Sequence, residues 1–352
     1  MKISNILLLV LSLHAPLLAN PPWRDVFTFS ELKSVSLEKL EKGEVIGVRI
    51  ELDGSELSLG VESFYAVEIP PAEVLKKINT FSLTDSEANQ SLDVKLHVTH
   101  GSPAHSNHFS QFNLDPSAQG YTWFLEESAK SINGFTCFNL SKNETRELSK
   151  TYKTNKLFPD SPFTKDQSEK IAQTWRDLLQ QRALNFQKGG LMGSAPYEGS
   201  DGTFELGKEF VRALKSRPKL LQNFSAVLDP VMAGRPVPNA LAPTYYWEKS
   251  IIQGAPTISL SAIFSQPTQQ GYRVAEITYY VTGNYYGGLI LYELYPTKIN
   301  GKNGTLIYRS DVVLSPSMTY IKGIERMAAG NILLLEIKNS ALSFIQASHS
   351  KN

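Results

Sequence analysis

The C-terminal third of the chain alternates apolar and polar positions over four runs, and then changes to a helical period. The runs are rich in β-branched and aromatic residues, which is typical of strands. We expect strands at Thr257–Phe264, Gly271–Val281, Tyr286–Tyr295 and Thr305–Leu314. The connections between them are short, and Asn303-Gly304 tolerates the positive φ of a tight turn, so the pattern predicts antiparallel neighbours.

Alternation along these strands also predicts which side chains share a face of the sheet. One face would carry Ala275, Ile277, Tyr279, Val281, Ile290, Tyr292, Leu294, Leu306, Tyr308 and Val312. The other face would present Glu276, Glu293, Arg309 and Asp311 to water. A slip of one residue would invert the assignment, because successive side chains point to opposite faces.

After Pro316, aliphatic residues recur at the three- and four-residue spacing of a helix or its multiples. The stripe consists of Ile321, Ile324, Ala328, Ile332, Leu335, Leu342 and Ile345. It predicts a long helix from about Met318–Tyr320 that rests on the sheet. Gly323 and Gly330 each cost about 1 kcal/mol relative to alanine inside a helix, so they either permit close approach to the sheet or break the element. A strand over Asn331–Ile337 is the alternative.

The rest of the chain predicts further elements from caps, periodicity and turn residues. We expect strands at Glu44–Leu52, Leu57–Ile69 and Leu92–Thr99, and helices at Ala72–Phe81, Ser161–Gln187, Glu205–Lys215 and Lys219–Phe224. Thr164 and Gln167 have the spacing of a capping box at the start of the longest of these helices.

The run from Gly60 to Phe81, a strand ending in an Ala/Pro turn that leads into an amphipathic helix, resembles the opening of the START-like (SRPBCC, helix-grip) superfamily. The C-terminal strands and final helix resemble the rest of that fold, so the resemblance covers residues 44–99 and 247–347. Residues 134–141 and 246–249 also resemble uncharacterised secreted bacterial proteins of that layout.

This resemblance implies an α+β fold in which a curved antiparallel sheet grips a long C-terminal helix. It implies one domain over residues 20–351, with a large, mostly helical insertion at 100–246. In that superfamily the sheet and the last helix enclose a cavity for lipids, sterols or polyketides.

Composition and the N-terminus limit the functional class. The chain of 352 residues is 41% hydrophobic and 20% charged, with a net charge of +1, which gives no electrostatic case for nucleic acid. Lys2, the apolar run Ile6–Leu13 and the small residues of Ala15–Ala19 predict a signal peptide at 1–19, hence a periplasmic or secreted protein. No other stretch reaches transmembrane length. Cys137 is the single cysteine, so no intrachain disulfide can form.

Candidate chemistry is confined to one histidine-rich segment. His97, His100, His105 and His108 are four of the six histidines, and imidazole suits Zn, Cu or Ni. The chain lacks an HExxH pattern, a nucleophile elbow, a P-loop and a dinucleotide fingerprint. We therefore expect a protein without catalysis or cofactor, and keep a metal-binding protein or enzyme centred on these histidines as an alternative.

Tyrosine is concentrated where the predicted cavity would lie. Eleven of the 15 tyrosines fall between Tyr245 and Tyr320, and a tyrosine combines an apolar ring with a polar tip. We expect Tyr279, Tyr292 and Tyr308 to line a site for a lipid or apolar small molecule. Ordinary β-sheet propensity also explains the enrichment, and a packed interaction module without ligand is a further alternative.

Overall fold

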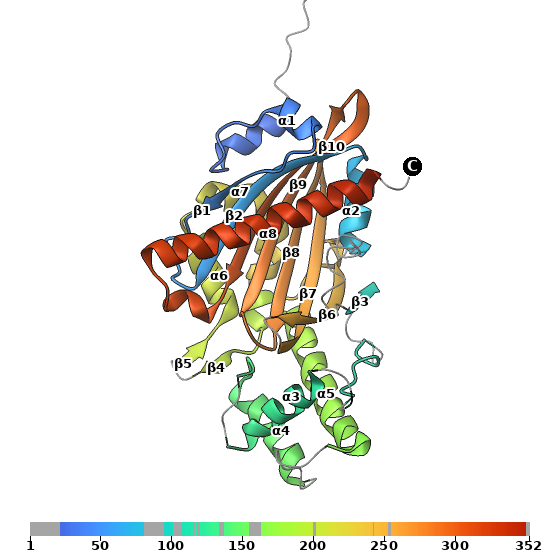
Figure 1. The fold of residues 1–352 in the computed structure, drawn as a ribbon, viewed down its shortest axis with the longest axis vertical. Coiled ribbons are helices and arrows are strands. Elements are labelled where there is room, and N and C mark those ends of the chain that lie inside the picture. Colours follow the sequence, from blue (N-terminus) through green and yellow to red (C-terminus); the bar gives the residue numbers. More distant parts are fainter. Residues whose placement is uncertain are drawn as a thin grey trace, which may run out of the picture.

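The computed structural model describes residues 22–80, 95–100, 108–115, 117, 120–133, 137–154, 163–199, 202–241, 243–252 and 255–349. Within these residues an eight-stranded antiparallel sheet has the strand order β1-β2-β10-β9-β8-β7-β6-β3 (Figure 1). Its strands are β1 (Ile46–Ile50), β2 (Ser58–Val67), β3 (Lys95–His100), β6 (Thr244–Ile252), β7 (Ala255–Thr268), β8 (Gly271–Val281), β9 (Gly287–Ile299) and β10 (Lys302–Leu314). A separate ribbon pairs β4 (Tyr197–Gly199) with β5 (Gly202–Phe204).

Helices cover both faces of the sheet. They are α1 (Leu37–Glu41), α2 (Pro71–Thr80), α3 (Tyr121–Ala129), α4 (Lys142–Thr154), α5 (Lys165–Gly189), α6 (Leu206–Leu214), α7 (Pro218–Met232) and α8 (Gly323–His349). Short 3-10 turns are η1 (Pro22–Thr28), η3 (Lys130–Asn133), η4 (Gly190–Gly193), η5 (Asn239–Leu241) and η6 (Pro316–Thr319). The fold is α+β, a curved antiparallel sheet with a long C-terminal helix, as the sequence predicted.

The two ends of the described chain meet in the sheet. Strand β2 pairs with β10 along the whole length of β2, from Val67 opposite Thr305 to Ser58 opposite Leu314. The chain then leaves β10 through η6, and α8 crosses the sheet over β1 and β2 towards α2 (Figure 1). Residues 331–337 are therefore helical, and the alternative of a strand there is wrong.

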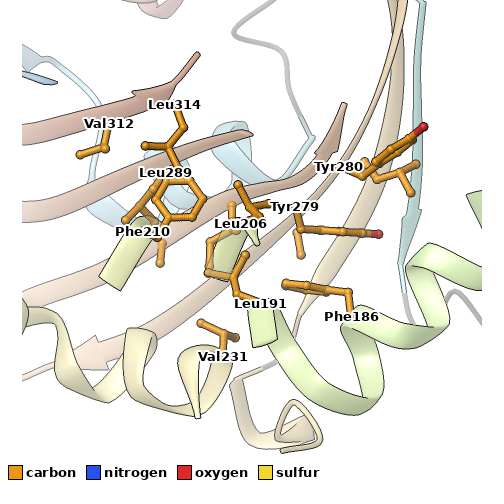
Figure 2. Close-up of a cluster of buried hydrophobic side chains, with 14 of the residues drawn as sticks. Phe186, Leu191, Leu206, Phe210, Val231, Tyr279, Tyr280, Leu289, Val312 and Leu314 are labelled. Atoms are coloured by element: carbon orange, nitrogen blue, oxygen red, sulfur yellow. The ribbon is translucent and has the colours of Figure 1, made fainter. Parts of the chain in front are cut away.

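One face of the sheet carries the larger core. Helices α5, α6 and α7 pack against it, and Figure 2 shows their aliphatic and aromatic side chains meeting those of β8, β9 and β10. Phe186, near the end of α5, stacks on Tyr279 of β8 with ring centroids 4.0 Å apart. Near its middle the same helix buries Trp175 against Phe124 and Phe138. Helix α5 thus links the sheet to the group of helices below it in Figure 1.

A buried ion pair crosses this larger core. Arg217, just before α7, donates from Nη2 to Glu62 Oε1 of β2 at 2.6 Å. Glu62 also accepts hydrogen bonds from Ser30 Oγ at 2.6 Å, the Glu31 backbone N–H at 2.8 Å and Tyr308 Oη at 3.0 Å. Glu62 is fully buried and Arg217 is 6% exposed. Four segments distant in sequence therefore meet at one carboxylate.

The opposite face packs against α8 and α2. Phe344 and Ile345 of α8, with Val74 and Ile78 of α2, lie on Tyr65, Val67, Val274, Tyr292, Leu294 and Ile307 of the sheet. The strands between the two cores are buried on both sides, since helices cover both faces of the sheet.

That two-sided burial explains the wrong assignment of faces in β9. Ala275 pairs with Leu291 and Ile277 with Leu289, and all four belong to the larger core. Tyr292 and Leu294 lie on the α8 face, one residue out of phase with the prediction. The run from Gly287 to Tyr292 is apolar on both faces, so alternation did not distinguish them.

The turn between β9 and β10 lies three residues before the predicted one. Asn300 has φ 50° and Gly301 has φ 77°, and together they form the tight turn. Asn303 and Gly304 are inside β10, where a Cβ at Gly304 would lie 2.5 Å from the Val67 carbonyl oxygen. Both Asn-Gly pairs suit a turn locally, and the pairing of β10 with both neighbours decided between them.

Candidate functional site

Along most of its length, helix α8 presents to the sheet the side opposite to the one predicted. Of the stripe expected to be buried, Ile324 is 84% exposed, Ile332 59%, Leu335 58% and Leu342 38%, whereas Ile345 at its C-terminal end is buried as predicted. The rest of the buried side carries Gly330, Ala341 and Phe344.

Small residues explain this choice of face. A Cβ at Gly330 would lie 2.8 Å from Arg49 Cδ, and a Cβ at Gly47 would lie 2.8 Å from Leu334 Cδ1. The backbone of α8 can therefore approach β1 closely only on its glycine side. Both sides of the helix are apolar, so periodicity could not select between them.

The C-terminal half of α8 is packed on the sheet. Phe344 meets the ring of Tyr65 edge-on at 6.3 Å between centroids, and Ala341 and Ile345 fill the space between α8, α2 and the strands.

The three predicted ligand-binding tyrosines do not share a site. Tyr279 and Tyr308 lie in the larger core, on the face of the sheet opposite α8, so their predicted position beneath the terminal helix is wrong. Tyr279 stacks on Phe186, and Tyr308 donates to Glu62. Tyr292 alone is on the α8 face. Strong β-sheet propensity placed tyrosines on both faces.

Tyr292 belongs to a buried polar network beside α8. Tyr246 Oη donates to Glu276 Oε1 at 2.7 Å, and Tyr292 Oη donates to Glu276 Oε2 at 3.3 Å. On the neighbouring strand Arg309 Nη2 donates to Asp311 Oδ1 at 2.7 Å. Burial raises the pKa of both the Glu276 and the Asp311 carboxyl groups.

All four charged residues predicted to face water are buried, so that prediction is wrong. Glu276 is 8%, Arg309 7% and Asp311 3% exposed, all on the α8 face. Glu293 is 3% exposed in the larger core, where it accepts from Arg273 Nε at 2.5 Å and Asn223 Nδ2 at 2.7 Å. Glu276 and Glu293 find their partners on other elements, which no local pattern reveals, whereas Arg309 and Asp311 pair with each other within β10.

Open space lies under the N-terminal half of α8, where a groove of about 540 Å³ separates the helix from the sheet edge. The turn after β1, the beginning of β2, η6 and the first two turns of α8 form its walls. Its apolar lining consists of Ile50, Leu52, Leu59, Met318, Ile321 and Met327. Its charged lining consists of Arg49, Glu51, Asp53, Glu56, Lys322 and Arg326.

Two arginines fix the width of this groove. Arg326 of α8 donates to the carbonyl oxygens of Glu56 at 2.8 Å and Ser58 at 2.5 Å. Arg49 of β1 donates to the Met327 carbonyl at 3.3 Å. These bonds attach the helix to the sheet edge at two points, so the groove is preformed.

Gly60 lies where the groove meets the larger core. A Cβ at Gly60 would lie 2.4 Å from Ile50 Cγ1 and 2.9 Å from Leu52 Cδ1, so only glycine lets these two aliphatic side chains, which are 5% and 6% exposed, pack over β2. The lining of the groove combines apolar side chains with equal numbers of cationic and anionic ones. Such a lining suits a ligand with an apolar body and a polar or zwitterionic end.

The predicted metal site gains no support from the described residues. His97 and His100 are in strand β3, and His105 lies outside the described residues. His108 is 5% exposed beside Phe109, and burial lowers its pKa to about 4. Among the residues that the structure describes, no three His, Cys, Asp or Glu side chains are grouped to hold a metal ion.

Comparison of the chain with protein-family models, with curated proteins and with solved structures gives no match. In the part of the chain that the structure describes, no helix is both long and apolar enough to cross a bilayer. The predicted signal peptide at 1–19 lies outside the described residues. Any functional assignment therefore rests on the geometry of this chain.

Proposed function

We propose that this is an exported protein that binds an amphipathic small molecule or lipid, without catalysis, in the groove under the N-terminal half of α8. The observation that carries the proposal is the preformed groove itself, whose volume of about 540 Å³ lies within the usual range of small-molecule sites. The apolar run near the N-terminus supports export.

The residues around the groove support an apolar ligand that enters from solvent. Met327 lines the groove and is 51% exposed, and Ile324 and Tyr320 next to it are 84% and 75% exposed. A ligand lying along the groove would cover apolar surface that is now hydrated, which is the main source of affinity for such molecules. Lys322 and Asp53 offer charges of both signs to its polar end.

Extraction and a matched pair of variants would test the proposal. Purified protein is extracted with organic solvent and the extract analysed by mass spectrometry. Separately, binding of N-phenyl-1-naphthylamine and of dansylundecanoic acid is titrated by fluorescence. Met327→Gln should weaken probe binding by roughly tenfold, since it replaces apolar contact surface. Met192→Gln, at a methionine that is 41% exposed outside the groove, should leave binding unchanged.

An extract without apolar molecules, together with equal probe affinities for the wild type and both variants, would end the proposal. Weakening by Met192→Gln alone would likewise place the site elsewhere.

A further inference from the structure

A second pocket lies at the end of the sheet, where residues of the turn between β7 and β8, of β9, of α7 and of η1 surround it. Its volume of about 320 Å³ lies at the lower end of the usual range for small-molecule sites. Its lining shares no residue with that of the groove under α8. The proposed lipid site therefore does not account for this pocket.

The lining of this pocket includes a buried carboxylate that uses only one of its two oxygens. Glu293 Oε1 accepts from Arg273 Nε at 2.5 Å and from Asn223 Nδ2 at 2.7 Å. Asn223 Oδ1 in turn accepts from Arg273 Nη2 at 2.9 Å, so the three side chains hold one another in place. Glu293 is 3% exposed, and its Oε2 has no hydrogen-bond partner among the described residues. Leaving a buried polar atom unpaired is costly, so a ligand group that donates to Oε2 would gain binding energy there.

The charges around the pocket favour a cation. The charged lining consists of Asp25, Arg273 and Glu293, and Arg273 is already paired with Glu293. Asp25 is exposed, and no other cation of the lining offsets its charge. Burial raises the pKa of the Glu293 carboxyl group, and the nearby negative charge of Asp25 raises it as well. A positive charge in the pocket would therefore stabilise both ionised carboxylates.

We propose that this pocket binds a small organic cation through an ammonium group, which donates to Glu293 Oε2 and lies beside the carboxylate of Asp25. The last torsion of a glutamate side chain is broad, so a modest rotation turns Oε2 to the ligand without moving the backbone. The exposed amides of Gln269 and Gln270 also line the pocket, and their oxygens can accept from the remaining N–H groups.

The same lining disfavours a metal ion and an anion. The guanidinium of Arg273, bonded to Glu293 Oε1, would repel a bare divalent ion that the same carboxylate bound. Within the described part of the chain, no three His, Cys, Asp or Glu side chains are grouped to hold a metal. An anion would meet two carboxylates and only one guanidinium, which is already paired.

Three probes of four carbons separate these classes by charge. Putrescine has an ammonium group at each end, 1,4-butanediol has hydroxyl groups and succinate has carboxylates. By isothermal titration calorimetry in 150 mM NaCl, putrescine should bind with a dissociation constant on the order of 0.1 mM. The diol should bind at least about tenfold more weakly, since it has no charge, and succinate should not bind.

Variants of the two carboxylates test the position of the site. Glu293→Gln should weaken putrescine binding by about tenfold or more, because it removes the buried charge at the same side-chain size. Asp25→Asn, at an exposed residue, keeps the core intact and should weaken binding by roughly threefold. Asp229→Asn, at an exposed carboxylate of α7 outside the pocket, is the matched control and should bind putrescine like the wild type.

Circular dichroism establishes that each variant is folded, and Asp25→Asn and the diol keep the test decisive if Glu293→Gln does not fold. The proposal is overturned if putrescine fails to bind at up to about 10 mM, or if the diol binds as tightly, which would indicate a site for neutral polyols. Equal weakening by Asp25→Asn and Asp229→Asn would also overturn it, because the attraction would then be a general property of the surface.

Discussion

The ion pair between Arg217 and Glu62 provides the sharpest test of how the two ends of the chain are held together. In Arg217→Met the carboxylate of Glu62 stays fully buried and keeps its bonds from Ser30, Glu31 and Tyr308, but it loses the guanidinium counter-charge at 2.6 Å. Breaking a buried pair from one side typically costs about 3–5 kcal/mol. Methionine retains most of the side-chain volume, so we assign the expected loss to the uncompensated charge.

A double-mutant cycle separates charge from packing. In Arg217→Met combined with Glu62→Gln, no buried charge remains, so the double variant should be more stable than Arg217→Met alone. The free energy of unfolding is measured by urea titration, followed by tryptophan fluorescence. Arg235→Met, at an exposed arginine, is the control and should change stability by less than about 0.5 kcal/mol.

The reasoning fails if Arg217→Met costs less than about 1 kcal/mol, or if the double variant loses the sum of the two single losses. Either result would mean that the bonds from Ser30, Glu31 and Tyr308 alone keep the Glu62 carboxylate stable in the core.

Two further predictions concern the face of the sheet under α8. Phe344→Ala should lower the free energy of unfolding by about 3–5 kcal/mol, because it empties a buried site. Ile324→Ala on the same helix, 84% exposed, should cost less than about 1 kcal/mol, and equal losses would contradict the observed orientation of α8. Burial, together with the negative charge of nearby Glu276, raises the pKa of the Glu248 carboxyl group from 4.5 to about 7. The folded state holds this proton more tightly than the unfolded state does. The free energy of unfolding should therefore fall as the pH rises from 4.5 through 7 and the carboxyl group ionises. Glu248→Gln should remove up to about 3 kcal/mol of this decline. The decline is measured by thermal unfolding at pH 5 and pH 8. A variant with the same pH profile as the wild type would refute the raised pKa.

Elements with a strong local signal were predictable. The capping box of Thr164 and Gln167 begins α5 as expected, with both reciprocal hydrogen bonds formed. Pro71 opens α2, and β8 runs over the predicted residues Gly271–Val281. Strand β6 and helix α3 were missed, since their short apolar runs lack a clear period, and helix α4 was missed because it is mostly polar, with Leu148 and Tyr152 its apolar residues.

The candidate site was predicted at the terminal helix but not at the correct residues. Burial of side chains on both faces of β8, β9 and β10 removed the alternation that would have separated Tyr292 from Tyr279 and Tyr308. The groove depends on the approach of η6 and α8 to the β1–β2 edge, and this approach is set by contacts such as Arg326 with the Ser58 carbonyl.

By itself the sequence determined the α+β class, the antiparallel C-terminal strands and the long final helix, because period, caps and turn residues act over a few neighbouring positions. Tertiary structure alone decided which side of α8 rests on the sheet, which Asn-Gly pair makes the turn, and that Glu62 is buried against Arg217. Each of these depends on what a distant segment offers at the point of contact. Gly47 and Gly330 let the backbones of β1 and α8 approach each other, and the missing Cβ atoms have this effect only because the two segments meet.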